Sequence, residues 1–115
     1  MVKMIALVKK RDGLTIEEFS RYWFDKHAPL VGKLLPQSVS SGWKKYIQNY
    51  AISLNNKGKA PFDGVAELYF NDMSSFWLWS NWYFSDEGKS LREDEDNFMD
   101  RTKTIVIVAE EKIVF

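Results

Sequence analysis

The alternation of apolar and polar stretches along the chain predicts four strands and two helical regions. Apolar runs bounded by turn residues indicate strands at residues 2–10, 43–54, 64–70 and 104–115. Apolar residues recur at helical spacing between the first two runs and again between the last two. The order strand, helix, strand, strand, helix, strand is that of a ferredoxin-like βαββαβ subunit, which places the chain in the α+β class.

The first helical region has a defined start and an expected interruption. Thr15 and Glu18 have the spacing of a capping box, so we expect the helix to begin near Ile16. Pro29 disfavours helical backbone angles at the residue before it. A break or kink is therefore expected around His27, followed by a short helical continuation.

The second helical region is unusually aromatic and ends in acidic residues. Asp72 is expected to cap it, and Ser85 is expected to restart a helical stretch that reaches Phe98. Residues 76–84 are apolar almost all round the helix, and their second side could line a pocket, touch a partner copy or bind another protein. The acids at 93–96 project in different directions, and we expect a solvated face rather than a metal site.

The strands carry more apolar residues than two helices can cover. A monomer's four-stranded sheet should alternate apolar with polar positions, yet residues 4–8 and 105–108 are uninterrupted apolar runs. We therefore expect both faces of the central strands to be buried, the second face by another copy in a homodimer. A monomer with only short buried segments is the alternative.

Composition narrows the function further. The 115 residues form a single expected domain, 1–115, and the absence of cysteine excludes disulfides, thiol nucleophiles and iron–sulfur clusters. The 16 basic and 16 acidic residues argue against a nucleic-acid partner. No apolar run approaches the ~20 residues of a membrane span, and no export signal is visible, so we expect no membrane partner and a cytoplasmic location.

Few residues offer chemistry. On a helical wheel His27 and Trp23 fall on the inward stripe, where a lone histidine is either a satisfied core residue or an acid/base in a cavity. With one histidine and no cysteine we expect no metal and no other cofactor; a haem with His27 as axial ligand is a weaker idea.

Polar residues also occur along the predicted second and third strands. Tyr46, Gln48 and Tyr50 share one strand face, a row suited to a phenol- or lactone-sized ligand or to the rim of the sheet. Glu67 lies within an apolar strand, either as a second proton carrier or paired with a lysine, Lys44 or Lys45, across the hairpin.

Several segments together resemble the EthD family. Residues 18–31 are similar to the end of the family's first helix, F-x-x-Y-W-x-x-x-H-A-P-L-V, and residues 45–50 and 63–70 are similar to its second and third strands. Residues 94–101 are similar to its D-E-x-N-F-x-D signature. The resemblance covers nearly the whole chain in order.

This resemblance implies a dimeric α+β barrel with a small-molecule pocket between the sheet and helices of each subunit. Family relatives include cofactor-free enzymes that isomerise lactones or dehydrate aromatic polyketide-like compounds, and the founding member accompanies an oxidative degradation pathway. We therefore expect an isomerase or lyase for a small aromatic or lactone compound. The alternatives are an accessory protein of oxidative catabolism, an oxidoreductase only by association, and a non-catalytic ligand-binding dimer.

The resemblance also suggests roles for individual residues. His27 would be the acid/base, Tyr46 a pocket hydroxyl and Asn49 a further residue of the matching strand motif. Tyr50 stands where family members often have a second histidine, so a mechanism that needs two imidazoles is not expected. The predicted substrate pocket comprises Trp23, Tyr46, Asn49, Tyr50 and Glu67.

Overall fold

The computed structural model describes residues 1–54 and 60–115 and has the predicted order of elements. The strands are β1 (Val2–Val8), β2 (Trp43–Tyr50), β3 (Gly64–Phe70) and β4 (Ile105–Glu110). The helices are α1 (Ile16–Tyr22), α2 (Ala28–Leu34), α3 (Gln37–Ser40), α4 (Met73–Phe84) and α5 (Lys89–Glu95), with a π-helical turn at Trp23–His27 and a 3₁₀ turn at Asp86–Gly88. None of the helices in this described part combines the length and apolar character needed to cross a bilayer.

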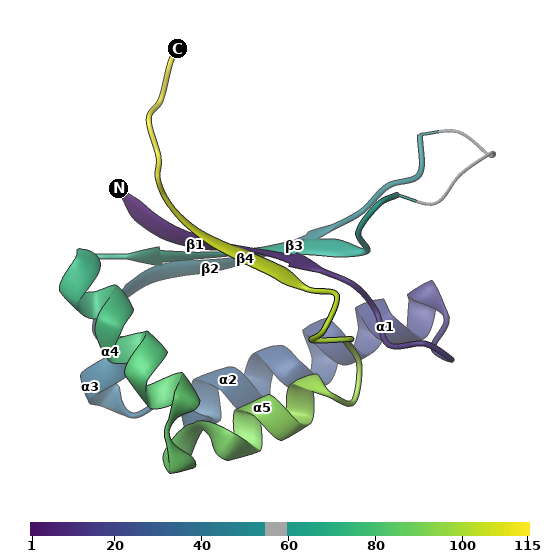
Figure 1. Ribbon diagram of the computed structural model, residues 1–115, viewed down its shortest axis with the longest axis horizontal. Coiled ribbons are helices and arrows are strands. Elements are labelled where there is room, and N and C mark those ends of the chain that lie inside the picture. Colours follow the sequence, from purple (N-terminus) through teal and green to yellow (C-terminus); the bar gives the residue numbers. More distant parts are fainter. Residues whose placement is uncertain (55–59) are drawn as a thin grey trace.

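The four strands form one antiparallel sheet in the order β2-β3-β1-β4. Ala6 at the centre of β1 is opposite Ala66 of β3 and Val106 of β4. All the helices lie on one side of this sheet, as Figure 1 shows. The ferredoxin-like α+β fold is thus confirmed, with its core between one sheet face and the helices.

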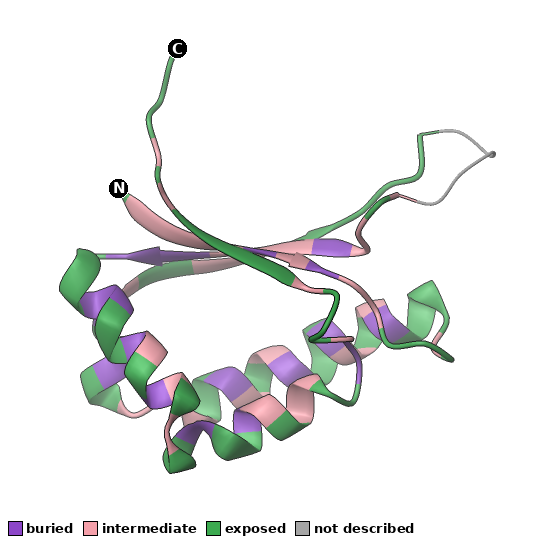
Figure 2. Cartoon of the chain, viewed as in Figure 1, coloured by how far each residue is buried: buried purple, intermediate pink, exposed green. Residues whose placement is uncertain are grey.

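Two groups of buried side chains fill the space between sheet and helices. One joins β3, α4 and α5 around Phe70, Trp79 and Leu91, and the other joins α1 to the segment after α5 around Phe19 and Phe98. Figure 2 shows buried positions along the sides of the helices that face the sheet. The sheet therefore needs no further cover on this face.

The predicted capping box at the start of α1 is confirmed, and the break or kink predicted around His27 takes the form of a π-helical turn, with the helix continuing as α2. Thr15 accepts a hydrogen bond from the Glu18 backbone, and the Glu18 carboxylate accepts one from the Thr15 backbone. Ala28 keeps right-handed helical angles, and its N–H donates to the carbonyl of Trp23, five residues earlier. The wider π-turn lets the helix run through the proline instead of stopping before it.

The other boundaries are close to those predicted. Asp72 caps α4 by accepting a hydrogen bond from Ser75 N. The helical stretch after Ser85 ends at Glu95, before Phe98, and strands β2 and β4 stop at Tyr50 and Glu110, sooner than the sequence pattern predicts. Between the predicted second and third strands, the turn-rich stretch 55–61 indicates a loop. It falls partly on residues 55–59, which lie outside the described residues.

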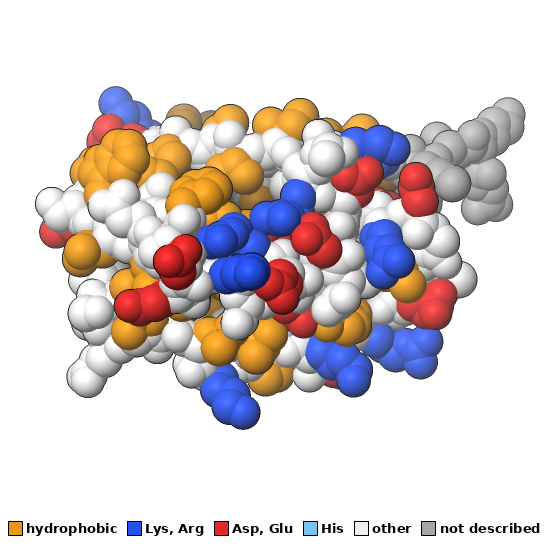
Figure 3. Space-filling view, turned by 60° about the horizontal axis from the view of Figure 1, so that its bottom comes forward, with side chains coloured by type: hydrophobic (Ala, Val, Ile, Leu, Met, Phe, Trp, Pro, Cys, Tyr) orange, Lys and Arg blue, Asp and Glu red, His pale blue; other side chains and the backbone are white. Residues whose placement is uncertain are grey.

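The aromatic helix α4 has one buried and one exposed side. Phe76, Trp79 and Trp82 are buried, whereas Trp77 and Phe84 are exposed. Hydrophobic side chains accordingly gather over α4 on the face that Figure 3 presents. The sheet-facing side of α4 therefore belongs to the core and to the pocket described below.

The sheet face opposite the helices carries apolar and charged residues without any covering element. Ile105 and Ile107 in β4 are each half exposed, and residues 111–115 leave the sheet as an extended arm on this side (Figure 1). Near the start of β1 on this face, Lys3 forms ion pairs with Glu67 at 2.8 Å and with Glu111 at 2.9 Å. The single chain thus leaves the second sheet face uncovered, as the strand pattern predicts.

Candidate functional site

The single histidine of the chain lies at the centre of the candidate site. His27 ends the π-helical turn, is only 4% exposed, and packs its ring against Phe98 with ring centroids 4.7 Å apart. Its Nδ1 lies 2.8 Å from Oδ2 of Asp94 in α5. The predicted inward orientation of His27 is confirmed, and a carboxylate from the second helical region is its partner.

The carboxylate of Asp94 is itself held in place. Its Oδ1 accepts a hydrogen bond of 2.5 Å from the Tyr22 hydroxyl, which in turn accepts one of 3.0 Å from Asn97 Nδ2. Each oxygen of Asp94 therefore has a fixed partner, one from α1 and one from the π-turn. A histidine oriented by a carboxylate in this way presents its other ring nitrogen in a defined direction.

Burial favours the neutral imidazole at this position. Desolvation lowers the pKa of His27, while the hydrogen bond and charge of Asp94 act in the opposite direction. Because an ionised carboxylate only accepts hydrogen bonds, we assign the proton of the neutral ring to Nδ1 and the lone pair to Nε2. Among the described residues no hydrogen-bond partner meets Nε2, so it is free to act as a base.

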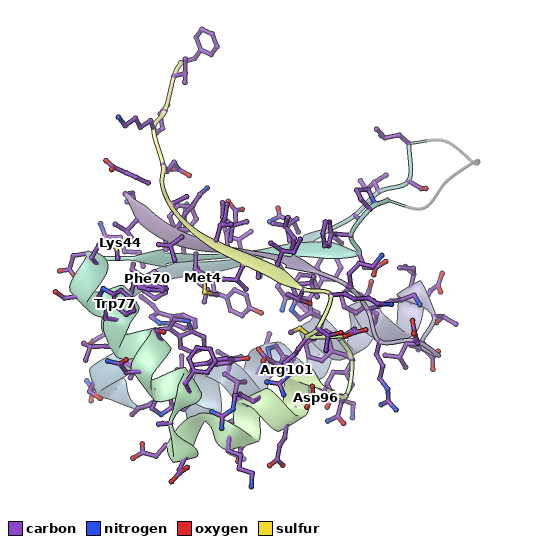
Figure 4. The ribbon with its side chains drawn as sticks, in the orientation of Figure 1. Met4, Lys44, Phe70, Trp77, Asp96 and Arg101 are labelled. Carbon is purple, nitrogen blue, oxygen red and sulfur yellow. The ribbon has the colours of Figure 1, made fainter. Side chains whose placement is uncertain are left out.

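Two adjoining cavities lie between the sheet and the helices. The inner one, about 60 Å³, borders His27, Trp23, Tyr46 and Trp43, and the outer one, about 340 Å³, lies between α4 and the β1–β4 side of the sheet. They share wall residues from β1, α4, α5 and the segment after it: Met4, Ala6, Trp79, Glu95 and Met99. Figure 4 shows Met4 pointing from the sheet into this space.

The polar row on β2 lies on the same side of the sheet as the cavity. Gln48 Nε2 donates hydrogen bonds to the Tyr46 hydroxyl at 2.9 Å and to the backbone carbonyl of Trp23 at 3.1 Å, and the Tyr50 hydroxyl donates to Gln48 Oε1. Burial raises the pKa of Tyr46, so its phenol stays protonated at neutral pH. Tyr46 and Trp23 border the inner cavity, whereas Tyr50 is more exposed and packs on Trp23.

Asn49 and Glu67 lie on the opposite face of the sheet and do not line the cavity. Asn49 Nδ2 donates to Glu67 Oε2 at 3.1 Å, and Glu67 forms its ion pair with Lys3 of β1. The expected pairing of Glu67 with Lys44 or Lys45 is therefore wrong. The register places Glu67 opposite Ile5 of β1, so that lysine comes from the neighbouring strand rather than the hairpin.

Four residues of the site were not anticipated from the sequence: Asp94, Glu95, Tyr83 and Arg101. The acids at 93–96 were expected to form a solvated face, but Asp94 contacts His27, and Glu95 is half-buried at the junction of the cavities. The segment's D-E-x-N-F-x-D pattern was the available signal. The expectation holds for Glu93 and Asp96, which are exposed, and fails for Asp94 and Glu95, because successive helical positions differ in direction and α5 packs between the cavity and solvent.

No metal site is evident within residues 1–54 and 60–115. There, no three His, Asp or Glu side chains converge in a way that could hold an ion. The groups that the site itself offers are an imidazole, carboxylates and phenols.

The fold is shared with several solved structures. An ethyl tert-butyl ether D (EthD) family protein from Bacillus halodurans is 25% identical, with a TM-score of 0.67 over 97% of this chain and 99% of its own. A dimeric protein of unknown function and ferredoxin-like fold from Bacteroides fragilis is 15% identical, with a TM-score of 0.62 over 96% of this chain and 95% of its own. Hydroxynitrile lyase from Passiflora edulis is 15% identical, with a TM-score of 0.64 over 99% of this chain and 95% of its own.

These likenesses agree with the family to which the sequence itself is matched. The chain has no match among the curated proteins. The EthD domain, however, matches residues 11–102, which include His27, the polar row of β2 and the acidic end of α5. The chain belongs to the EthD family.

Proposed function

We propose that this protein binds a small, largely apolar carbonyl or phenolic compound beside His27 and acts on it by proton transfer, as an isomerase or lyase that needs no cofactor. The observation that carries the proposal is the pairing of a buried, neutral His27 with Asp94 at the wall of a cavity. Nε2 would remove a proton from the bound compound and later return it. General acid/base catalysis of this kind contributes about 10²–10⁴-fold in rate.

The polar groups at the cavity wall support an oxygen-bearing ligand. Trp43 borders the inner cavity, and its indole N–H is buried without a hydrogen-bond partner among the described residues. A buried donor left unpaired is unfavourable, so a ligand oxygen would satisfy it. Tyr46, on the same wall, offers a protonated phenol that could stabilise a developing oxyanion.

The remaining walls support an apolar ligand body. Phe76, Trp79 and Val106 line the outer cavity, whose volume of about 340 Å³ lies within the usual range for small-molecule sites. The hydroxynitrile lyase of Passiflora has the same fold, so this architecture accommodates lyase chemistry, although fold alone does not assign it here.

Assembly as a homodimer through the uncovered sheet face belongs to the same proposal. The half-exposed Ile105 and Ile107, with the exposed Phe115 at the end of the arm, are apolar surface that a second copy would bury. The Lys3–Glu67 ion pair of each copy lies on the same face, so the interface would contain charged as well as apolar side chains.

The proposed chemistry is tested by the exchange of acidic C–H protons with deuterated water. We suggest 2-coumaranone and 2-tetralone as probes, because they are an aromatic lactone and an aromatic ketone with protons next to the carbonyl. Exchange would be followed by proton NMR with wild-type protein, His27→Ala and Lys26→Ala. Lys26 is exposed in the same π-turn and serves as the matched control.

We expect wild type and Lys26→Ala to accelerate exchange of at least one probe, and His27→Ala to lose about 10²-fold or more of that rate while remaining folded. Circular dichroism and the melting temperature establish the folded state. Exchange at the buffer rate with wild type, or an undiminished rate per folded molecule with His27→Ala, would contradict proton transfer by His27. If the probes bind without exchange, the protein is a non-catalytic binder.

A further inference from the structure

Glu95 is a half-buried titratable group that has no role in the proton transfer described above. It is the only carboxylate among the described residues lining the inner cavity, and it also borders the outer one. Its helix, α5, holds His27 through Asp94 one residue earlier. An imidazole and a carboxyl group therefore border the same 60 Å³ space from different elements.

The surroundings of Glu95 hold its carboxyl group in a fixed place. The Tyr83 hydroxyl, from α4, donates a hydrogen bond to Oε1 of Glu95. Arg101 borders the outer cavity with Glu95 and is fixed by Asp96, whose two oxygens accept hydrogen bonds of 2.8 and 3.1 Å from its guanidinium. Figure 4 shows Arg101 and Asp96 beside each other at the end of α5.

The charges around Glu95 oppose one another, and burial decides the balance. Desolvation raises the pKa of Glu95 to about 7, assisted by the negative charges of Asp96 and Asp94, while the Tyr83 hydrogen bond and the charge of Arg101 act in the opposite direction. At neutral pH a substantial share of the molecules therefore carries the neutral acid. A catalytic acid is most effective when its pKa lies near the working pH.

We propose that Glu95 is a second catalytic residue, the proton donor that acts with His27, and that the substrate is a carbonyl compound with an acidic C–H beside the carbonyl carbon. This inference rests on the proposed function and adds its substrate class. The apolar part of such a compound would occupy the outer cavity, and its carbonyl oxygen would meet Glu95 where the cavities join.

The step balances without any further reactant. Nε2 of His27 takes the proton from the carbon beside the carbonyl, and the electron pair of that C–H bond forms a carbon–carbon double bond. The carbonyl oxygen takes the proton of the Glu95 carboxyl group, which gives an enol, an imidazolium and a carboxylate. In a substrate that already has a carbon–carbon double bond next to the deprotonated carbon, the product of this step is a dienol. Return of the proton from the imidazolium to the far carbon of the dienol, and of the hydroxyl proton to Glu95, gives the conjugated isomer and restores both groups.

Arg101 and Tyr83 suit the second half of this cycle. Once Glu95 has lost its proton, the Arg101 charge and the Tyr83 hydroxyl stabilise the carboxylate. The proton acceptor and the proton donor thus come from different elements, the π-turn and α5, that the fold brings to one cavity. A site with two such groups avoids a free enolate, which a single base would have to form.

The test compares Glu95→Gln with Glu93→Gln in the deuterium-exchange assay with 2-coumaranone and 2-tetralone. Glutamine keeps the shape and the acceptor for Tyr83 but carries no transferable carboxyl proton. Glu93 is the matched control, since it is an exposed glutamate on the same helix. The rates would be measured between about pH 5.5 and pH 9, with His27→Ala in parallel.

We expect Glu95→Gln to lower the wild-type exchange rate about 10-fold or more and to remove the fall in rate that wild type shows as pH rises through about 7. Glu93→Gln should match wild type. Loss of exchange in His27→Ala, together with an undiminished rate and an unchanged pH profile in Glu95→Gln, would overturn the role of Glu95 while leaving the proposed function intact. If wild type itself exchanges at the buffer rate, both proposals are refuted.

Discussion

Replacing Glu95 by glutamine should stabilise the protein, and only at neutral and alkaline pH. The folded state holds the pKa of this carboxyl group at about 7, compared with its ordinary value of 4.5. Below pH 4.5 the group is protonated in the folded and unfolded states alike. Between about 4.5 and 7 the folded state binds more protons than the unfolded state, so the free energy of unfolding of wild type falls as pH rises.

The size of the effect follows from the same two pKa values. A difference of about 2.5 corresponds to about 3 kcal/mol at most, since one pKa unit is worth about 1.36 kcal/mol. Glu95 is half-buried rather than fully enclosed, so we expect about 1–3 kcal/mol at pH 8. Glutamine has no charge to desolvate and keeps the acceptor for Tyr83, so the variant should avoid this loss of stability.

The measurement is urea unfolding followed by tryptophan fluorescence at pH 4.5 and pH 8, at one protein concentration. Wild type and Glu95→Gln should have similar free energies of unfolding at the lower pH and differ by about 1–3 kcal/mol at the higher pH. Glu93→Gln on the exposed side of the helix should show no such divergence. A Glu95→Gln variant that is less stable than wild type at pH 8 would refute the reasoning. So would a variant whose free energy of unfolding differs from that of wild type by the same amount at both pH values.

Three further predictions concern packing, the histidine and assembly. A Cβ at Gly64 would lie 2.4 Å from Cζ3 of Trp23, so Gly64→Ala should lower stability by about 1–3 kcal/mol in thermal unfolding. Gly32 has open space around it, so the control Gly32→Ala should be neutral or stabilising. Asp94→Asn should lower the pKa of His27 further, because it removes the carboxylate that raises it, and should slow probe exchange about 10-fold or more; an unchanged NMR titration would contradict the pairing. Light scattering should give about 27 kDa, twice the 13.5 kDa chain, and a uniform 13.5 kDa particle would contradict the dimer.

The helices and strands could be predicted from local sequence signals, because the start and the buried side of each element depend on residues that are close together in the chain. The hydrogen bonds of Thr15 and Glu18 begin α1 where the capping pattern places it, and the 3.6-residue repeat correctly turns His27 inward. The irregularity expected near Pro29 is present, but its form was not predicted: a π-turn, which the pattern does not encode, carries the helix past the missing N–H.

The partners of the site residues could not be predicted in the same way, because they come from distant parts of the chain. Asp94 is 67 residues from His27, and Lys3 is 64 residues from Glu67. Period-two alternation correctly puts Tyr46, Gln48 and Tyr50 on one face of β2, but which sheet face the helices cover is not encoded locally. Asn49 and Glu67 are consequently predicted in the pocket although they lie on the other face.

The state of the His27 imidazole is the most direct test of the central claim. The chain has a single histidine, so selective ¹⁵N labelling gives the two ring nitrogens of His27 alone. We predict a pKa below 6.5, a neutral ring with its proton on Nδ1, and a change in the Nε2 signal when 2-coumaranone is added. A neutral ring protonated on Nε2, or ring signals that do not respond to saturating probe, would contradict the account of His27 as a base facing a ligand cavity.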